Sequence, residues 1–536
     1  MCALAQNDSS IVSCHSALAR NNIGFYRVHL TFNSQLSTFN SQLGIDMKNK
    51  MKTSGILLHI SSLPGAYGIG GMGREAYEFT DFLKKAGQSY WQILPICPPG
   101  FGNSPYQAFS AFAGNPYLID PEQLAESGLL LPEELPHWEP TDKVDFSRVY
   151  PEKDKLFSAA FARFRKDRSY QAFLKRNRDW LPEYALFMAV KDHFGGVCWL
   201  EWEADIRSHA PEAVARYTAF LQEKIDYHCF LQYEFDRQWR KLHSYAKKNG
   251  IRILGDIPIY VPLDSADVWA CPENYRLDSD RRPEVVAGCP PDGFSETGQY
   301  WGNPIYDWAR MERSGFDWWL RRVGSAAAKF DAVRIDHFRG IESYWSIPAE
   351  HSTAQYGHWE KGPGMALIDA IRKAYPKTEF IAEDLGFLTP EVLQLVADSG
   401  FPGMKVLEFA FDPREPGNYL PHLYGENCVC YTGTHDNETL CQWCEGISPE
   451  SRTYAREYLG ISPEADLADA IITAGMRSNA RLFVAQMQDY LRLGGNARMN
   501  EPGTLKEENW RWRMLPGAAN DKLAEKIAAW TLLRQM

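Results

Sequence analysis

The sequence of 536 residues lacks any long hydrophobic run. No segment approaches the roughly 20 apolar residues that a helix needs to cross a bilayer. It also lacks a basic excess, because 68 Asp and Glu residues outnumber 57 Lys and Arg residues and give a formal net charge of −11. A nucleic-acid-binding surface needs the opposite charge balance. We therefore expect no nucleic-acid partner, no membrane partner and a cytoplasmic protein.

The 11 cysteines lack the regular spacing of a disulfide framework. Reduced thiols in a reducing compartment are the simpler interpretation. Cys441 and Cys444 form a lone C-x-x-C with no second pair and no matching His pair nearby. A structural zinc site needs four ligands. We therefore expect no metal site.

A dinucleotide site also lacks its required context. Gly68–Gly73 matches G-x-G-x-x-G literally, but seven residues, 61–67, separate it from the preceding apolar run. In a dinucleotide fold the glycines follow the strand directly and an acid ends the next strand. Here the next run ends Pro95-Ile-Cys-Pro-Pro99 without an acid. We expect a tight turn at these glycines and no organic cofactor.

Residues 1–50 differ in character from the rest of the chain. The segment Ser-Thr-Phe-Asn-Ser-Gln-Leu repeats imperfectly between Thr31 and Leu43 and offers little apolar surface. A chain that buries so little apolar surface does not fold by itself. We expect a polar, disordered N-terminal extension over 1–50 and a catalytic domain over 51–536.

Apolar runs alternate with helical patterns along most of that domain, which predicts parallel strands joined by helices. The expected helices include 74–86, 183–192, 221–249, 308–329, 364–374 and 390–397. The expected strands are 56–60, 90–96, 252–261, 331–337, 379–385, 404–411 and 429–432, with an eighth near 491–499. Eight such units predict an α/β fold of the (βα)8 TIM-barrel type.

The strand spacing is irregular and indicates inserted segments. The helical patterns between about 120 and 250 are too long for a loop, so we expect a mainly helical subdomain there. Residues 271–304 hold several prolines and glycines, which predicts a loop-like insertion that lies over a site as a lid.

Three carboxylates lie at or near the ends of three apolar, strand-like runs: Asp336, Glu383 and Asp436. In a barrel of this kind the chemistry gathers at the C-terminal ends of the strands. Carboxylates that converge there suit cleavage of a sugar linkage, in which one attacks and a protonated one donates. Arg334, two residues before Asp336, lies on the same strand face and is expected to hold Asp336 ionised.

Each acid has a structural alternative when it is considered alone. Arg334 and Asp336 also suit a buried structural salt bridge. Glu383 and Asp384 also suit a solvated strand end, and His435-Asp436-Asn437 also suits a helix cap. The occurrence of acids after three separate strands favours the catalytic interpretation.

At this level of detail the chain resembles the 4-alpha-glucanotransferases of the amylomaltase (disproportionating enzyme) family, in the alpha-amylase clan. The resemblance runs from about Gly55 to about Met514. The motifs that carry it include Ser104-Pro-Tyr-Gln107, Gly255-Asp-Ile-Pro258, Pro290–Pro304, Arg334-Ile-Asp-His-Phe-Arg-Gly340, Ala382-Glu-Asp-Leu-Gly386, Thr432-Gly-Thr-His-Asp-Asn437 and Ala497-Arg-Met-Asn500.

The resemblance implies a role for each acid: Asp336 as nucleophile, Glu383 as acid/base and Asp436 as stabiliser of the transition state. It places further residues along the glucan groove: Tyr106, Asp256, Asp292, Trp301, Arg334, His435 and Asn500. The implied partners are α-1,4-glucan donors and acceptors, namely maltooligosaccharides, amylose and glycogen fragments. The implied reaction is retaining transfer of a glucan segment, without cofactor or metal.

Two other functions remain open at this stage. A hydrolytic alpha-amylase would share the barrel and the three acids, and products from maltotriose would separate the two activities. A non-catalytic glucan-binding protein would be expected to lack one of the three acids, and none is missing.

Overall fold

The computed structural model describes residues 52–291, 295–414 and 419–534. Its centre is an eight-stranded parallel sheet in the order β10-β11-β12-β1-β2-β3-β6-β9. The strands are β1 (Thr53–Leu57), β2 (Tyr90–Gln92), β3 (Arg252–Ile257), β6 (Ala332–Ile335), β9 (Glu379–Ala382), β10 (Gly403–Val406), β11 (Cys428–Tyr431) and β12 (Leu482–Gln486). Nearly every residue of these strands is buried, as expected for a parallel sheet covered on both faces.

The two end strands of this sheet approach each other and almost close it. Ala382 N–H donates to the carbonyl of Pro402, 2.9 Å away, and Met404 N–H donates to Asp384 Oδ1 at 2.6 Å. A Cβ at Gly403 would lie 2.4 Å from Asp384 Oδ2, so glycine is needed for this approach. The predicted α/β barrel is confirmed.

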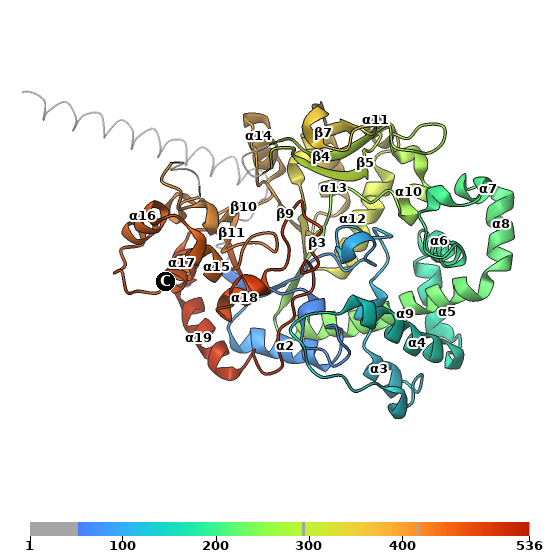
Figure 1. Ribbon diagram of the computed structural model, residues 1–536, viewed down its shortest axis with the longest axis horizontal. Helices are drawn as coiled ribbons and strands as arrows, with labels where there is room; N and C mark the ends of the chain where they lie inside the picture. Colours follow the sequence, from blue (N-terminus) through green and yellow to red (C-terminus); the bar gives the residue numbers. More distant parts are fainter. Residues whose placement is uncertain (1–51, 292–294, 415–418, 535–536) are drawn as a thin grey trace, which may run out of the picture. The chain divides into compact units, whose positions relative to one another are not determined.

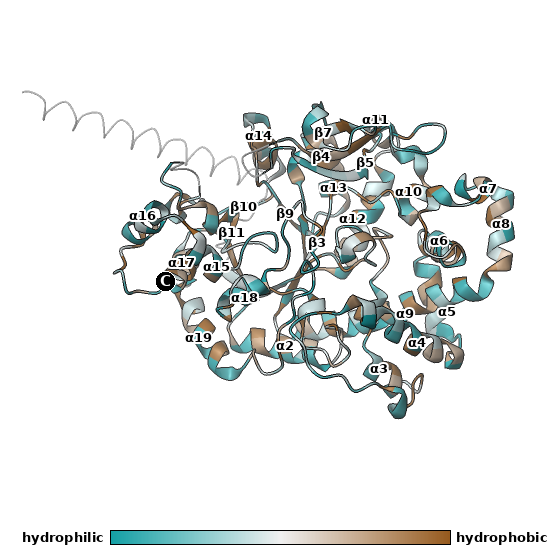
Figure 2. Cartoon of the chain, in the orientation of Figure 1, coloured by the Kyte–Doolittle hydropathy of each residue, from teal (hydrophilic) through white to brown (hydrophobic). Residues whose placement is uncertain are grey.

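Helices surround the barrel (Figure 1). Those that follow or flank its strands are α2 (Arg74–Lys85), α10 (Ala266–Ala270), α11 (Trp308–Arg313), α12 (Asp317–Lys329), α13 (Met365–Ala374), α14 (Pro390–Ser399), α15 (Leu440–Gly446), α16 (Pro449–Leu459), α17 (Leu467–Arg477), α18 (Met487–Tyr490) and α19 (Asp521–Thr531). The helix α2 buries Ala76, Phe79, Phe82 and Leu83, the face that the apolar spacing predicts. Figure 2 shows hydrophobic and hydrophilic residues alternating along α2 and α19.

The chain between β2 and β3 is largely helical, on the right and lower side of Figure 1. Its helices are α3 (Pro121–Glu126), α4 (Phe146–Arg163), α5 (Arg168–Arg176), α6 (Leu181–His193), α7 (Ala204–Arg207), α8 (Pro211–Phe220) and α9 (Gln222–Lys248). The long helix α9 makes contacts within this segment and beyond it. Gln232 exchanges two hydrogen bonds with the backbone of Gly114, and Trp239 donates to the carbonyl of Lys329 at the end of α12.

A second, antiparallel sheet replaces the loop expected over 271–304. Its order is β5-β4-β7-β8, with β4 (Val285–Cys289), β5 (Gln299–Pro304), β7 (Ser343–Pro348) and β8 (His358–Lys361). The loop-like interpretation is therefore wrong for β4 and β5. The prolines and glycines between β4 and β5 give this segment a loop-like composition. However, β4 forms a strand by pairing with β7, which lies far away in sequence, and β5 pairs with the other edge of β4.

The eighth barrel strand also differs from its prediction. It is β12 (Leu482–Gln486), which pairs with β1 and β11, whereas 491–499 contains a short 3-10 turn, Gly495–Ala497. The apolar run Leu-Phe-Val-Ala is fully buried in β12. Such a short continuous run is the pattern of a parallel strand covered on both faces. This pattern in the sequence could have identified β12.

The predicted N-terminal extension over 1–50 lies outside the described residues. In the described part of the chain, no helix is long and apolar enough to cross a membrane.

Candidate active site

The three predicted acids lie just beyond the C-terminal ends of barrel strands. Asp336 follows the last residue of β6, Glu383 follows the last residue of β9, and Asp436 lies five residues beyond β11. Parallel strands end at one edge of a barrel, so these positions bring the acids to the same mouth. They differ in access: Glu383 is buried, whereas the side chains of Asp336 and Asp436 are 26% and 42% exposed.

Arg334 joins two carboxylates inside the barrel. Its Nη1 donates to Asp256 Oδ2 at 2.5 Å and its Nη2 lies 2.7 Å from Asp336 Oδ1. The strand register explains the first bond, because Asp256 of β3 lies opposite Arg334 of β6. Tyr106 Oη donates to the same Asp256 oxygen at 2.7 Å. Tyr106, Asp256, Arg334 and Asp336 therefore form one network.

Backbone N–H groups hold Glu383. His337 N–H donates to Oε2 at 2.7 Å and Leu385 N–H donates to Oε1 at 2.9 Å. His337 has a left-handed backbone, with φ 49°, which is uncommon for a residue other than glycine. That conformation lets the amide next to Asp336 point at Glu383, so the nucleophile candidate and the acid candidate are positioned by one turn.

Asp436 belongs to a polar cluster with His435 and Asn500. Its Oδ1 accepts from Asn500 Nδ2 at 2.6 Å and lies 3.4 Å from His435 Nε2. The His435 ring stacks on Tyr106 with centroids 5.1 Å apart and planes 12° apart. The helix-cap alternative for Asp436 is wrong, since Thr439 caps α15 by accepting from Gln442 N–H.

Trp301, the half-buried aromatic residue of β5, packs edge-on against His337 with ring centroids 4.8 Å apart. It therefore lies next to the turn that holds Glu383. The predicted groove residues Tyr106, Asp256, Trp301, Arg334, His435 and Asn500 are thus all connected to one of the three acids. Asp292 lies outside the described residues.

The acids share a site with too little positive charge to ionise all of them. Burial raises the pKa of Glu383, although Arg334 and the two backbone N–H groups oppose the shift. Burial also raises the pKa of Asp336; Arg334 opposes it, and Asp256, Glu383 and Asp436 add to it. Arg334 is the direct counter-charge of Asp336, while the crowding of carboxyl groups in a buried site favours retention of a proton.

Three residues of the mouth were missed from the sequence. His337 positions Glu383, and Trp510 packs at 5.8 Å from both Tyr106 and His435. His59 is buried two residues beyond β1, and burial followed by the charge of His435 lowers its pKa to about 3. The strand-end rule that found the acids would also have found His59. Trp510 lies in a loop, and no sequence pattern distinguishes it.

No cluster of His, Cys, Asp and Glu within the described ranges could hold a metal ion. Burial raises the pKa of both Cys441 and Cys444, which suits inert thiols rather than ligands. The donor set at the barrel mouth consists of carboxylates paired with Arg334, His435 and Asn500. This arrangement can supply an acid, a base and a nucleophile from the chain's own side chains.

Residues 58–518 match the model of a protein family described as 4-alpha-glucanotransferase. The chain belongs to the 4-alpha-glucanotransferase family. It is 46% identical over 477 residues to the 4-alpha-glucanotransferase of Clostridium butyricum, covering 88% of this chain and 98% of that protein. It is 47% identical over 488 residues to that of Thermus thermophilus, covering 89% and 97%.

A solved structure agrees with the sequence relatives. The amylomaltase from Streptococcus agalactiae, solved in complex with acarbose, superposes with a TM-score of 0.87 at 39% identity, covering 90% of this chain and 99% of that chain. Membership of the 4-alpha-glucanotransferase family makes the chain a glucan-acting enzyme with this transferase activity. The alternative of a non-catalytic glucan-binding protein is therefore wrong.

Proposed function

We propose that this 4-alpha-glucanotransferase moves α-1,4-glucan segments between maltooligosaccharides, amylose and glycogen fragments through an ester on Asp336. The single observation that supports these roles most strongly is the turn shared by Asp336 and Glu383. Asp336 is partly accessible and paired with Arg334, while Glu383 is buried and bonded to the amide of His337. The similar amylomaltase bound to acarbose supports a saccharide groove at this mouth.

The shared proton is assigned to Glu383 in the reactive form. Arg334 makes its direct ion pairs with Asp256 and Asp336, so the guanidinium stabilises the Asp336 anion directly. Glu383 is the more buried of the two candidate groups, and burial favours its neutral form. A protonated acid and an ionised nucleophile are the pair that a retaining glycosidic reaction requires.

The reaction has two steps. An Asp336 oxygen attacks the anomeric carbon, the glycosidic C–O bond breaks, and the Glu383 proton moves to the departing 4-oxygen. In the second step the 4-hydroxyl of an acceptor glucan attacks the same carbon, Glu383 takes its proton, and the ester bond to Asp336 breaks. Asp436 and Asn500 bind hydroxyls of the reacting sugar, where interactions that strengthen in the transition state accelerate both steps.

Glu383→Gln with α-maltotriosyl fluoride tests these roles. Fluoride leaves without a proton, so the first step proceeds, whereas the second step lacks its base. We expect a maltotriosyl adduct that accumulates on the protein and maps by mass spectrometry to the peptide containing Asp336. The double variant Glu383→Gln/Asp336→Asn is the control and should form no adduct. An adduct on another carboxylate would assign the nucleophile elsewhere.

Trp301 is proposed to favour transfer over hydrolysis. It packs on His337 beside the acid/base, where it can exclude water and position the acceptor sugar. Water is abundant, so transfer prevails only when the acceptor is aligned. Trp301→Ala should raise glucose release by hydrolysis relative to disproportionation of maltotriose by about fivefold, or about 1 kcal/mol, as read by chromatography of the products.

Tyr300→Ala is a matched control for this variant. Tyr300 precedes Trp301 in β5, is 41% exposed and points to the other face of the strand. The hydrolysis-to-transfer ratio should stay at the wild-type value in Tyr300→Ala. If Trp301→Ala is folded and keeps that ratio as well, Trp301 does not control the acceptor.

A further inference from the structure

Two exposed aromatic side chains lie on the rim of the barrel mouth, outside the groove already described. Phe387 is 69% exposed and lies in the loop between β9 and α14, four residues after Glu383. Trp359 of β8 is 38% exposed. The mechanism above uses neither ring.

One buried side chain ties the two aromatic residues together. The Arg339 guanidinium lies 3.8 Å above the Trp359 ring, and its Nη1 donates to the carbonyl of Phe387 at 2.6 Å. Arg339 is itself only 4% exposed and lies three residues after Asp336. Trp345 also packs edge-on against Trp359 at 5.1 Å. Arg339 therefore fixes the Trp359 ring and the backbone at Phe387, in a turn that follows the end of β6.

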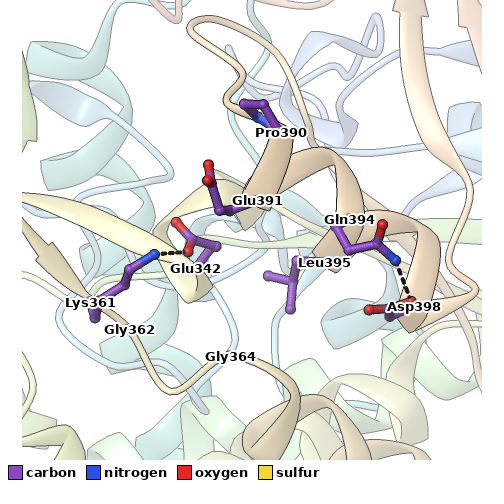
Figure 3. Close-up of a pocket in the computed structure, with 9 residues that line it drawn as sticks. All are labelled: Glu342, Lys361, Gly362, Gly364, Pro390, Glu391, Gln394, Leu395 and Asp398. Atoms are coloured by element: carbon purple, nitrogen blue, oxygen red, sulfur yellow. Dashed lines mark hydrogen bonds and ion pairs between the residues drawn. The ribbon is translucent and has the colours of Figure 1, made fainter.

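A pocket of about 550 Å³ (Figure 3) is lined by residues that are close in sequence to both rings. Its wall includes Lys361, two residues after Trp359, and Pro390, three residues after Phe387. Two of its polar pairs are already formed: Glu342 with Lys361, and Gln394 Nε2 with Asp398 Oδ1 at 2.8 Å. Glu391 also lines this pocket.

We propose that Phe387, Trp359 and this pocket form a second glucan-binding site, the rim site, which takes a distant stretch of the same α-1,4-glucan that occupies the catalytic groove. This inference rests on the proposed function. The aromatic faces suit stacking against the apolar faces of glucose rings. Carboxylate and amide oxygens of the pocket accept hydrogen bonds from sugar hydroxyls.

The charge of the rim site favours a neutral ligand. Glu342, Glu391 and Asp398 face one cation, Lys361, so an anionic ligand would be repelled. A neutral, hydroxyl-rich chain meets no such repulsion. Continuity with the mouth favours glucan in particular, because the β6 and β9 loops that carry Asp336 and Glu383 lead directly to Arg339 and Phe387. A short substrate that fills only the groove does not reach the rim site.

The test compares long and short substrates in the full-length chain. Phe387→Ala and the double variant Phe387→Ala/Trp359→Ala should raise the KM for long amylose five- to tenfold. The kcat/KM for disproportionation of maltotriose should stay within twofold of wild type. Retardation in native gels that contain amylose should fall in parallel, which reads glucan binding without catalysis. Phe220→Ala is the matched control, since Phe220 is 67% exposed but lies at the end of α8.

Several results would overturn the rim site. An equal loss of activity on maltotriose and on amylose would mean that the substitutions disturb the catalytic mouth. In that case Trp359→Phe, which retains a ring, should be no more active than Trp359→Ala. Unchanged amylose KM and gel retardation would show that the rings do not bind glucan, as would a Phe387-dependent dimer with normal glucan affinity. If wild-type protein fails to disproportionate maltotriose, the proposed function fails, while gel retardation still tests the rim site.

Discussion

Asp336→Asn is expected to lower the rate of glucan transfer at least about a thousandfold, which corresponds to about 4 kcal/mol of lost transition-state stabilisation. The amide is nearly the same size as the carboxylate, but it is too weak a nucleophile to form the ester. Arg334 keeps its second partner, Asp256, so the barrel network survives in part. Initial rates on maltotriose, with the melting temperature measured alongside, check this prediction.

Asp331→Asn supplies a control from the opposite end of the same strand. Asp331 precedes β6 and accepts hydrogen bonds from His243 and from Ile253 N–H, so its role is structural. We expect Asp331→Asn to lower the melting temperature and to leave the transfer rate of the folded protein near the wild-type value. Transfer by folded Asp336→Asn above a few per cent would show that Asp336 is not the nucleophile.

Arg334→Met is expected to lower the rate of glucan transfer about a hundredfold or more relative to wild type, and to shift the pH dependence of that rate. The guanidinium is the direct ion-pair partner of Asp256 and Asp336. The pKa of Asp336 is already raised by burial, and Arg334 acts against that rise. Without Arg334 the pKa of Asp336 rises further, so a smaller fraction is ionised at neutral pH.

The acid limb of kcat/KM should therefore move to higher pH in Arg334→Met. Arg322→Met is the comparison, because Arg322 is also buried but donates to the carbonyl of Ile259 instead of a catalytic acid. Its loss should cost stability and leave the pH limb in place. An acid limb that stays at its wild-type pH in folded Arg334→Met would contradict the electrostatic account.

The positions of the three acids at strand ends could be predicted because they depend on local sequence. Each follows a short apolar run, and such runs form strands wherever they are covered on both faces. The strands end earlier than their apolar runs suggest: β6 stops at Ile335 and β9 at Ala382. The acids are thus loop residues at strand ends, which leaves their side chains free to face the substrate.

The features that could not be predicted depend on contacts between distant segments. β4 pairs with β7 across more than 50 residues of sequence, and β5 pairs with the other edge of β4. The position of Trp510 depends on its packing with Tyr106 and His435. The protonation of the carboxyl groups could not be predicted either, because it depends on how many of them surround Arg334 in the folded site. By contrast, β12 and His59 carried recognisable signals.

Incubation of the wild-type protein with maltotriose, with products resolved over time, tests the central claim most directly. Transfer predicts glucose together with maltopentaose and longer chains, while the number of reducing ends stays nearly constant, because each broken linkage is replaced by a new one. Accumulation of glucose and maltose alone, with a steady rise in reducing ends, would contradict it and show that water is the acceptor.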